Sequence, residues 1–162
     1  RNSIQQEKMK EVSDRIGEKP QSFFHGTSYS GATGICGVDG KFLVPKSREE
    51  AEKLGLKYAG DMMGRGVYLA NMAGKSAGYF GTWGAGYNKA GCLLVCDAVL
   101  GKHKSADSHS KVQNDYSVDS VSMQPGTSTG NGRTLRAPEW CVRNEDWVAP
   151  KYILDMECVN RK

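Results

Sequence analysis

A nearly continuous apolar segment, from Cys92 to Leu100, constrains the fold more than any other feature of this sequence. Its residues do not alternate between apolar and polar, as they would in a strand with one wet face. Such a run is typical of a strand at the centre of a sheet, with both faces covered. The chain has 162 residues, which fit one compact domain and leave little room for a second. We therefore expect residues 1–162 to form a single domain around this strand.

Shorter elements are predicted on both sides of the central strand. Residues 1–19 carry apolar residues at helical spacing and predict an N-terminal amphipathic helix. Further strands are expected at 22–27, 67–70, 118–123, 140–142 and 152–158, and short helices at 28–36 and from Asn71, as the cap, to Tyr79. Loops are expected at 37–63 (with one or two helical turns), 81–91, 102–114 and 124–138. This order predicts an α+β domain.

Charge and hydropathy exclude some classes of partner. The net charge is only +4 and the basic residues are scattered, whereas phosphate neutralisation requires a dense Lys/Arg stripe. No apolar run approaches the roughly 18 residues that span a bilayer, and no signal-peptide pattern opens the chain. The sequence therefore predicts no membrane association, and its charge gives nucleic-acid binding only weak support.

The five cysteines are an odd number and include no Cys-x-x-Cys pair. Cys92 and Cys96 fall on one face of the central strand, where a thiol packs as a small apolar group. A zinc site requires closely spaced Cys and His ligands, and His103 and His109 are far in sequence from such a pair. We expect no metal, reduced structural thiols and an intracellular location, nuclear or cytoplasmic. Because the chain begins with Arg, we expect a domain of a longer protein.

Common nucleotide and hydrolase motifs are missing from the sequence. Residues 81–86 have the glycine spacing of a dinucleotide fingerprint in reverse, and residues 74–76 lack the upstream glycine of a phosphate loop. No Gly-x-Ser-x-Gly elbow occurs. A Cys/His or Ser/His hydrolase stays open: it would use His25, which lies in an apolar setting, but no residue is indicated as its nucleophile.

Three segments carry the functional signal. They are His25-Gly26-Thr27 after an aromatic strand, residues 64–72 (GRGVYLANM) continuing into 74–79 (GKSAGY), and residues 139–142 (EWCV). In this order, and joined by residues 91–96 (GCLLVC), they resemble the catalytic domain of the poly(ADP-ribose) polymerase family, the diphtheria-toxin-like branch of ADP-ribosyltransferases. The resemblance runs from Ser22 to Cys158, and the spacing from Glu139 to residues 151–154 (KYIL) also agrees.

The resemblance implies a fold and an activity. The expected fold has two small, mostly antiparallel sheets and a few short helices around an NAD+ cleft. The expected activity is transfer of ADP-ribose from NAD+, the co-substrate, to an acceptor, with release of nicotinamide. The family's His, Tyr and Glu correspond to His25, Tyr68 and Glu139 as catalytic residues. The expected NAD+-binding residues are His25, Gly26, Thr27, Ser28, Tyr68, Ala70, Lys75, Ser76, Tyr79 and Glu139.

At the nicotinamide end, these residue types suit a flat aromatic amide. The backbone of Gly26 can hold the carboxamide, which a side chain there would obstruct, and the Ser76 hydroxyl can add a further bond. Tyr68 and Tyr79 can stack on the two faces of the ring.

At the ribose end, Glu139 can bind the nicotinamide-ribose hydroxyl and stabilise an oxocarbenium-like ribose as nicotinamide leaves. Lys75 can assist near this Glu or the diphosphate. By resemblance, His25 bonds the adenine ribose and Ser28 touches the adenosine side. The loop 41–63 would lie over the donor, and residues 124–138 would shape the acceptor side.

Two features bear on the length of the product. The His-Tyr-Glu set resembles the polymerising branch, so we expect poly- or oligo-ADP-ribosylation. Ala137-Pro138 stands where chain-elongating members carry a larger aromatic-polar pair, and the 124–138 loop has few side chains to hold a polymer. Mono-ADP-ribosylation is the alternative. Only residues 1–21 precede the first motif, so we expect this chain to lack the upstream helical regulatory domain of DNA-dependent members.

Two rivals come from other classes. One is a catalytically inactive module that binds NAD+ or ADP-ribose. The other is a tRNA phosphotransferase of related fold, although the sequence has no Arg and His cluster for an RNA phosphate. A protein acceptor, including this chain itself, is the expected partner; nucleic acid stays open, through other domains or as an acceptor.

Overall fold

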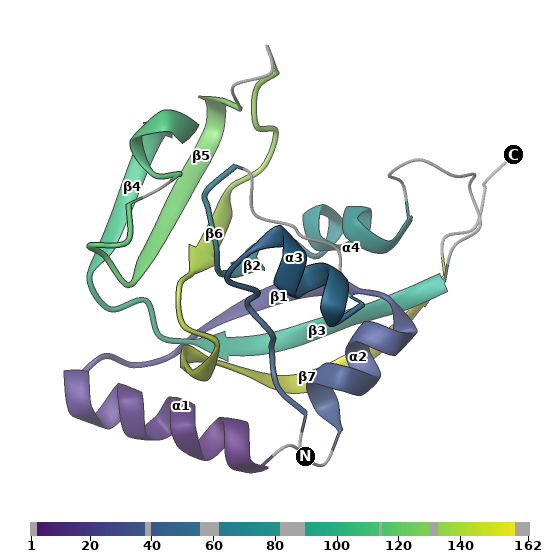
Figure 1. The fold of residues 1–162 in the computed structure, drawn as a ribbon. Helices are drawn as coiled ribbons and strands as arrows, with labels where there is room; N and C mark the ends of the chain where they lie inside the picture. Colours follow the sequence, from purple (N-terminus) through teal and green to yellow (C-terminus); the bar gives the residue numbers. More distant parts are fainter. Residues whose placement is uncertain are drawn as a thin grey trace, which may run out of the picture.

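The computed structural model describes residues 3–37, 40–55, 62–81, 90–113, 115–129 and 133–157. Two sheets organise them (Figure 1). The first has the strand order β1 (Gln21–Thr27), β3 (Ala90–Ala98), β7 (Val148–Glu157), and the second β2 (Val67–Leu69), β6 (Glu139–Val142), β5 (Ser120–Ser128), β4 (His103–Ser108). Neighbouring strands are antiparallel except β4 and β5, which are parallel. The predicted α+β fold with two mostly antiparallel sheets is confirmed.

The helices are short and begin or end at recognisable residues. They are α1 (Ser3–Ile16), α2 (Tyr29–Cys36), α3 (Arg48–Lys53) and α4 (Ala73–Gly81), with 3₁₀ turns at His109–Lys111 and Glu145–Trp147. Gly17, at φ +70°, follows the end of α1, and the Ser28 hydroxyl caps α2 by accepting the Gly31 amide. The predicted cap of α4 was wrong by one residue: the carbonyl of Met72, not Asn71, accepts the first helical bonds. Within the described ranges, no helix is both long enough and apolar enough to cross a membrane.

The three-stranded sheet contains the larger hydrophobic core. Leu93 and Leu94 of β3 are 1% and 0% exposed although they point to opposite faces, as predicted for a central strand. Met9 and Val12 of α1 and Ile35 of α2 pack on the face that carries Leu94. Figure 1 shows both helices on the lower side of this sheet and α4 above it. Burying one such leucine contributes about 2 kcal/mol, so this layer is the main source of stability.

The four-stranded sheet differs most from the sequence-based expectation. Residues 102–114 were expected as a polar, solvated loop, but His103–Ser108 form the edge strand β4, in which Ala106 alone is fully buried. An edge strand made of polar residues is difficult to predict from sequence, because a single buried position does not produce the alternation of apolar and polar residues that indicates a strand. The strand expected to end at Met123 continues to Ser128, and Ser128 forms a bridge with Thr134, so the expected 124–138 loop is partly extended structure. The last strand begins at Val148, four residues before the expected Tyr152.

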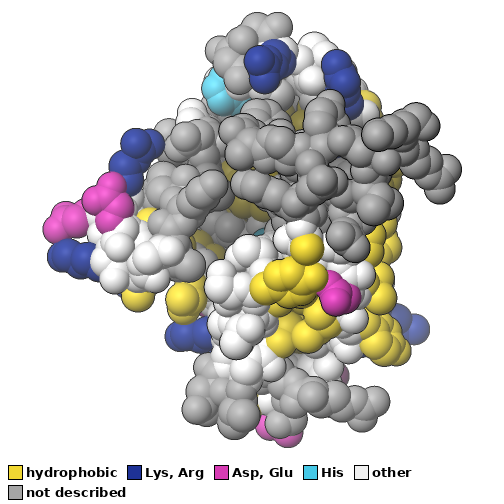
Figure 2. Space-filling view, turned by 90° about the vertical axis from the view of Figure 1, so that its right-hand side faces the viewer, with side chains coloured by type: hydrophobic (Ala, Val, Ile, Leu, Met, Phe, Trp, Pro, Cys, Tyr) yellow, Lys and Arg dark blue, Asp and Glu magenta, His cyan; other side chains and the backbone are white. Residues whose placement is uncertain are grey.

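The end of β7 leaves apolar side chains in solvent. Tyr152, Ile153 and Leu154 are 60%, 53% and 43% exposed on this outer strand. Figure 2 shows hydrophobic side chains gathered on the face where β3 begins and β7 ends. The core therefore lies between the sheets and the helices, and the outer strand contributes little to it here.

Candidate active site

The two sheets meet at a backbone bridge that lies next to most of the predicted site residues. The Phe24 amide donates to the Ala70 carbonyl at 2.7 Å, and the Ala70 amide donates to the Phe24 carbonyl at 3.0 Å. The bridge brings β1, with His25 and Gly26, against the end of β2, which carries Tyr68. Ala70 is 1% exposed, and its backbone forms the bridge.

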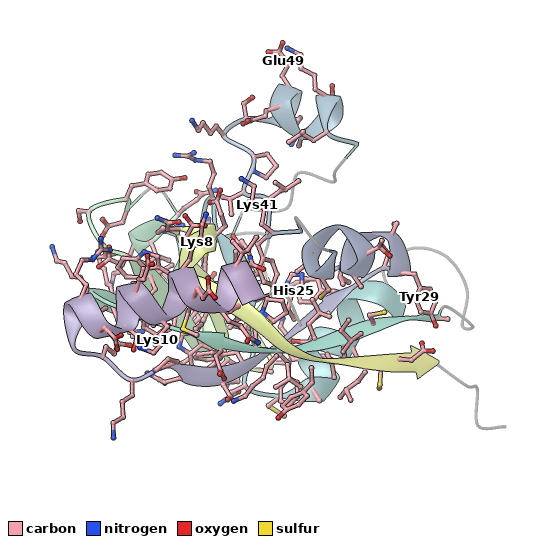
Figure 3. The ribbon with its side chains drawn as sticks, turned by 90° about the horizontal axis from the view of Figure 1, so that it is seen from below. Lys8, Lys10, His25, Tyr29, Lys41 and Glu49 are labelled. Atoms are coloured by element: carbon pink, nitrogen blue, oxygen red, sulfur yellow. The ribbon has the colours of Figure 1, made fainter. Side chains whose placement is uncertain are left out.

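His25 is fixed in one orientation by β2. Its Nδ1 lies 2.9 Å from the Tyr68 carbonyl oxygen, which can only accept, so Nδ1 carries the proton. The edge of the ring meets Phe42, with centroids 5.1 Å apart. Burial lowers the pKa of His25, and Nε2 of the neutral ring is left as a hydrogen-bond acceptor. Figure 3 shows His25 in the interior and Tyr29 near the outer end of the sheet.

Gly26 is required by the packing of α4 on β1. A Cβ at this position would lie 1.8 Å from the Ser76 carbonyl oxygen. Ser76, 1% exposed, donates its hydroxyl to the Phe24 carbonyl at 2.9 Å. The expected reason for the glycine, room for a carboxamide, is therefore joined by a second one, contact with helix backbone. Because strand bonds alternate, the amide and carbonyl of Gly26 lie on the same edge of β1 as those of Phe24.

Glu139, at the start of β6, is a buried carboxylate held by two side chains of α4. It is 1% exposed, the Tyr79 hydroxyl donates to its Oε1, and the Lys75 ammonium lies 3.5 Å from its Oε2. Lys75 and Tyr79 are four residues apart and share one helix face, with the ammonium 5.6 Å from the Tyr79 ring centroid. Burial raises the pKa of Glu139, and the Lys75 charge opposes that rise.

Tyr68 is anchored by the turn that precedes its strand. Its hydroxyl accepts the Met63 amide at 2.9 Å and donates to the Gly64 carbonyl at 2.8 Å. Burial raises the pKa of this phenol well above its usual range, so it remains neutral. Both ends of Tyr68 are thus bonded: the carbonyl to His25 and the hydroxyl to the turn.

Thr27 and Ser28 lie where β1 ends. Thr27 is half-buried, while Ser28 is exposed and caps α2, with its hydroxyl 3.1 Å from the Gly31 amide and 3.1 Å from the Ser30 hydroxyl. Of the ten predicted residues, eight therefore form one connected group around the bridge, and these two lie at its edge, toward α2.

Sequence comparison identifies the family to which this geometry belongs. Residues 2–158 match the family described as "Poly(ADP-ribose) polymerase catalytic domain". The chain belongs to this family. It is also similar to "Poly [ADP-ribose] polymerase 2" of Arabidopsis thaliana, with 34% identity over 126 residues, which are 77% of this chain and 17% of that protein. The chain thus spans about a sixth of the length of this curated relative.

In this poly(ADP-ribose) polymerase catalytic domain, the predicted site residues do not line either of two surface cavities. One cavity, about 550 Å³, lies between β4 and residues 124–127, and the other, about 340 Å³, lies between α2 and the ends of β3 and β7. Neither contains a predicted site residue. The segment 41–63, expected to cover the donor, contributes Phe42 and Met63 to the site, and its residues 56–61 lie outside the described ranges. No metal-binding group of His, Cys, Asp or Glu occurs in the part of the chain that the structure describes.

Sequence reasoning missed one residue of this poly(ADP-ribose) polymerase domain that contacts the site: Arg143. It directly follows β6, and its guanidinium bonds the turn that anchors Tyr68. Part of the signal was present, because Arg143 continues the alternation of Glu139 and Cys141 one residue beyond β6, on the face of Cys141. Because this face begins with the candidate catalytic residue Glu139, Arg143 could have been included among the candidate site residues.

Proposed function

We propose that this domain transfers ADP-ribose from NAD+ to an acceptor and releases nicotinamide. Two findings support the proposal: membership of the family and the two bonded pairs His25–Tyr68 and Tyr79–Glu139. The observation that carries it is Glu139, a carboxylate that is 1% exposed between a phenol and an ammonium. Burying a carboxylate is costly even when a phenol and an ammonium contact it, and a buried carboxylate with a raised pKa is typical of a catalytic site.

In the proposed reaction, the bond between nicotinamide N1 and ribose C1′ breaks, and its electron pair stays on nicotinamide. C1′ becomes positively charged, and the Glu139 carboxylate stabilises that charge and binds the ribose hydroxyl. An acceptor oxygen then bonds to C1′, and its proton passes to Glu139. The raised pKa of Glu139 suits that step, because a carboxylate with raised pKa holds a proton more readily.

The remaining groups would orient the substrate. Tyr68 and Tyr79 would stack on nicotinamide, and Tyr79, 49% exposed, offers a ring face to a ligand. The backbone of Gly26 and the hydroxyl of Ser76 would hold its carboxamide. His25 would accept a hydrogen bond from the adenine ribose through Nε2, with Thr27 and Ser28 on the adenosine side. Lys75, beside Glu139, would contact the diphosphate or the acceptor.

We propose poly- or oligo-ADP-ribosylation of a protein acceptor, which includes this chain itself, in an intracellular setting. The His-Tyr-Glu set supports the polymer, and the free thiols of Cys36, Cys92, Cys96 and Cys141 support the setting. Mono-ADP-ribosylation is the second candidate, favoured by Ala137 and Pro138 directly before the Glu.

Labelled NAD+ tests the proposal, with adducts read by gel and intact mass. Glu139→Gln keeps the shape but removes the charge, so we expect transfer to fall by about 10²–10³-fold while NAD+ affinity changes little. The matched control is Glu11→Gln on α1, an exposed carboxylate outside the proposed site. It should transfer as well as the unmodified domain.

Each outcome has a distinct meaning. A ladder of masses supports polymer formation, and a single mass step supports mono transfer. Saturable NAD+ binding without adducts or nicotinamide release would replace the transferase with a binding module. Equal loss of binding and transfer in Glu139→Gln would make this residue structural.

A further inference from the structure

The turn before β2, residues 63–66, is held on several sides. Its backbone contains Gly64 at φ +81° and Gly66 at φ +155°. A Cβ on Gly64 would lie 2.0 Å from the Gln113 carbonyl oxygen, and one on Gly66 would lie 2.4 Å from the Cys141 sulfur. The turn therefore fits closely between Gln113 and Tyr116 on one side and β6 on the other, and its position depends on both.

Arg143 joins these parts through four backbone carbonyls. Its Nη1 donates to the carbonyls of Met63 at 2.5 Å and Arg65 at 2.8 Å. Its Nη2 donates to the carbonyls of Val112 at 2.9 Å and Asp115 at 3.1 Å. One planar guanidinium thus bonds the turn on one side and the segment 112–115 on the other, across about 80 residues of sequence.

An aromatic ring completes the clamp. The Arg143 guanidinium carbon lies 4.8 Å from the ring centroid of Tyr116, and that of Arg65 lies 5.0 Å from it. The Tyr116 hydroxyl accepts the Arg65 amide at 3.2 Å. The stacked ring restricts the plane of the guanidinium and so its bonding directions.

The clamped turn is the same one that bonds the Tyr68 hydroxyl, through the Met63 amide and the Gly64 carbonyl. We propose that Arg143 is a positioning residue that sets the Tyr68 ring for stacking on nicotinamide. This inference rests on the proposed function. Arg143 bonds the carbonyls of Met63 and Arg65, on either side of Gly64, and so links the turn that holds the Tyr68 hydroxyl to Val112 and Asp115.

The arrangement requires arginine in particular. Two terminal nitrogens in one plane can donate to two carbonyls each, in opposite directions, whereas a lysine ammonium is a single point that cannot serve both segments. Arg143→Lys keeps the charge and most of the aliphatic stem but separates the turn from segment 112–115. Tyr68 should then remain bonded to the turn while the turn itself moves.

The experiment compares Arg143→Lys with a control of matched stability. The control is Val12→Ala, which removes apolar contact between α1 and the three-stranded sheet, far from Tyr68. Thermal midpoints are measured for both variants, and the assay temperature is set below the lower one. The readouts are the Kd for nicotinamide alone, and KM and kcat for NAD+ from nicotinamide release.

We expect Arg143→Lys to weaken nicotinamide binding and to raise KM for NAD+ by about tenfold each, with kcat changed less than twofold. Val12→Ala should leave Kd and KM unchanged. A stability effect alone lowers the active fraction, hence the apparent kcat, at constant KM. Unchanged Kd and KM in Arg143→Lys, or the same loss in Val12→Ala, would overturn the inference.

Failure of the inference differs from failure of the proposed function. If the unmodified domain binds neither nicotinamide nor NAD+, the proposed function fails. If it binds both and Arg143→Lys binds them equally well, only the role of Arg143 fails.

Discussion

The three-stranded sheet is covered by apolar side chains from α1 and α2, whereas the four-stranded sheet combines a smaller apolar cluster with polar side chains that bond backbone carbonyls. In the first, Leu94 and Cys96 are 0% exposed against helical residues. In the second, Ser120 donates to the Leu100 carbonyl at 2.7 Å and Arg143 to four carbonyls. The candidate active site lies where these two kinds of structure meet, at the Phe24–Ala70 bridge.

The difference explains why the site is placed there. Apolar packing is strong but does not set the direction of a side chain, whereas hydrogen bonds are weaker and directional. His25 stands on a strand of the first sheet, where its ring packs against Phe42, and it takes its orientation from Tyr68 of the second. A site at the junction therefore combines a rigid base with directed polar groups.

The largest expected effect is a loss of stability when an apolar side chain of the three-stranded sheet is truncated. Leu94→Ala removes a side chain that is 0% exposed at the centre of β3, and should cost about 3 kcal/mol of unfolding free energy. Ser120→Ala in the other sheet loses its bonds to the Leu100 carbonyl and to Nδ1 of His103, and should cost about 1 kcal/mol. Urea unfolding gives both numbers, and equal costs would show that the two sheets are stabilised alike.

A second, smaller effect is expected at the junction, where α4 packs on β1. Gly26→Ala places a Cβ against the Ser76 carbonyl, so α4 must shift from β1, at a cost of about 2 kcal/mol. Because α4 carries Lys75 and Tyr79, NAD+ affinity should also fall. Calorimetry measures both, and Gly34→Ala, in open space on α2, is the matched control. Normal NAD+ binding by Gly26→Ala would remove α4 from the site.

The smallest expected effect is a change in the free energy of unfolding with pH, caused by the buried Glu139. The pKa of Glu139 is raised by burial, so the folded state holds this proton more tightly than the unfolded state. Its contribution is fully present below the ordinary glutamate value near 4.5 and is lost as pH rises through the folded pKa. Glu139→Gln lacks this loss, and its stability relative to the unmodified domain should rise between pH 4 and pH 8. A constant difference across that range would mean that Lys75 and Tyr79 fully offset burial.

The contrast between apolar packing and polar contacts also explains which elements could be predicted from the sequence. The strand β3 was predicted because its apolar residues are continuous, and α2 because Ser28 is a recognisable cap. The strand β4 was missed because His103–Ser108 are polar and pair in parallel with a strand that follows them. The proposed site residues come from motif order, and eight of the ten lie together around the Phe24–Ala70 bridge, while their roles stay predictions. Arg143 was missed because its role depends on four carbonyls brought near by folding; its alternation with Glu139 and Cys141 indicates a shared face but not these partners.

The strand pairing also has a consequence for how the chain folds. The central strand β3 pairs with residues far away on both sides, such as Gln21 with Ala98 and Ala90 with Glu157. Closing such long loops precedes the gain from pairing, so we expect folding in milliseconds to seconds rather than microseconds. During synthesis, β3 would wait with one edge open until β7 leaves the ribosome. That interval is when a neighbouring nascent chain could pair with it instead.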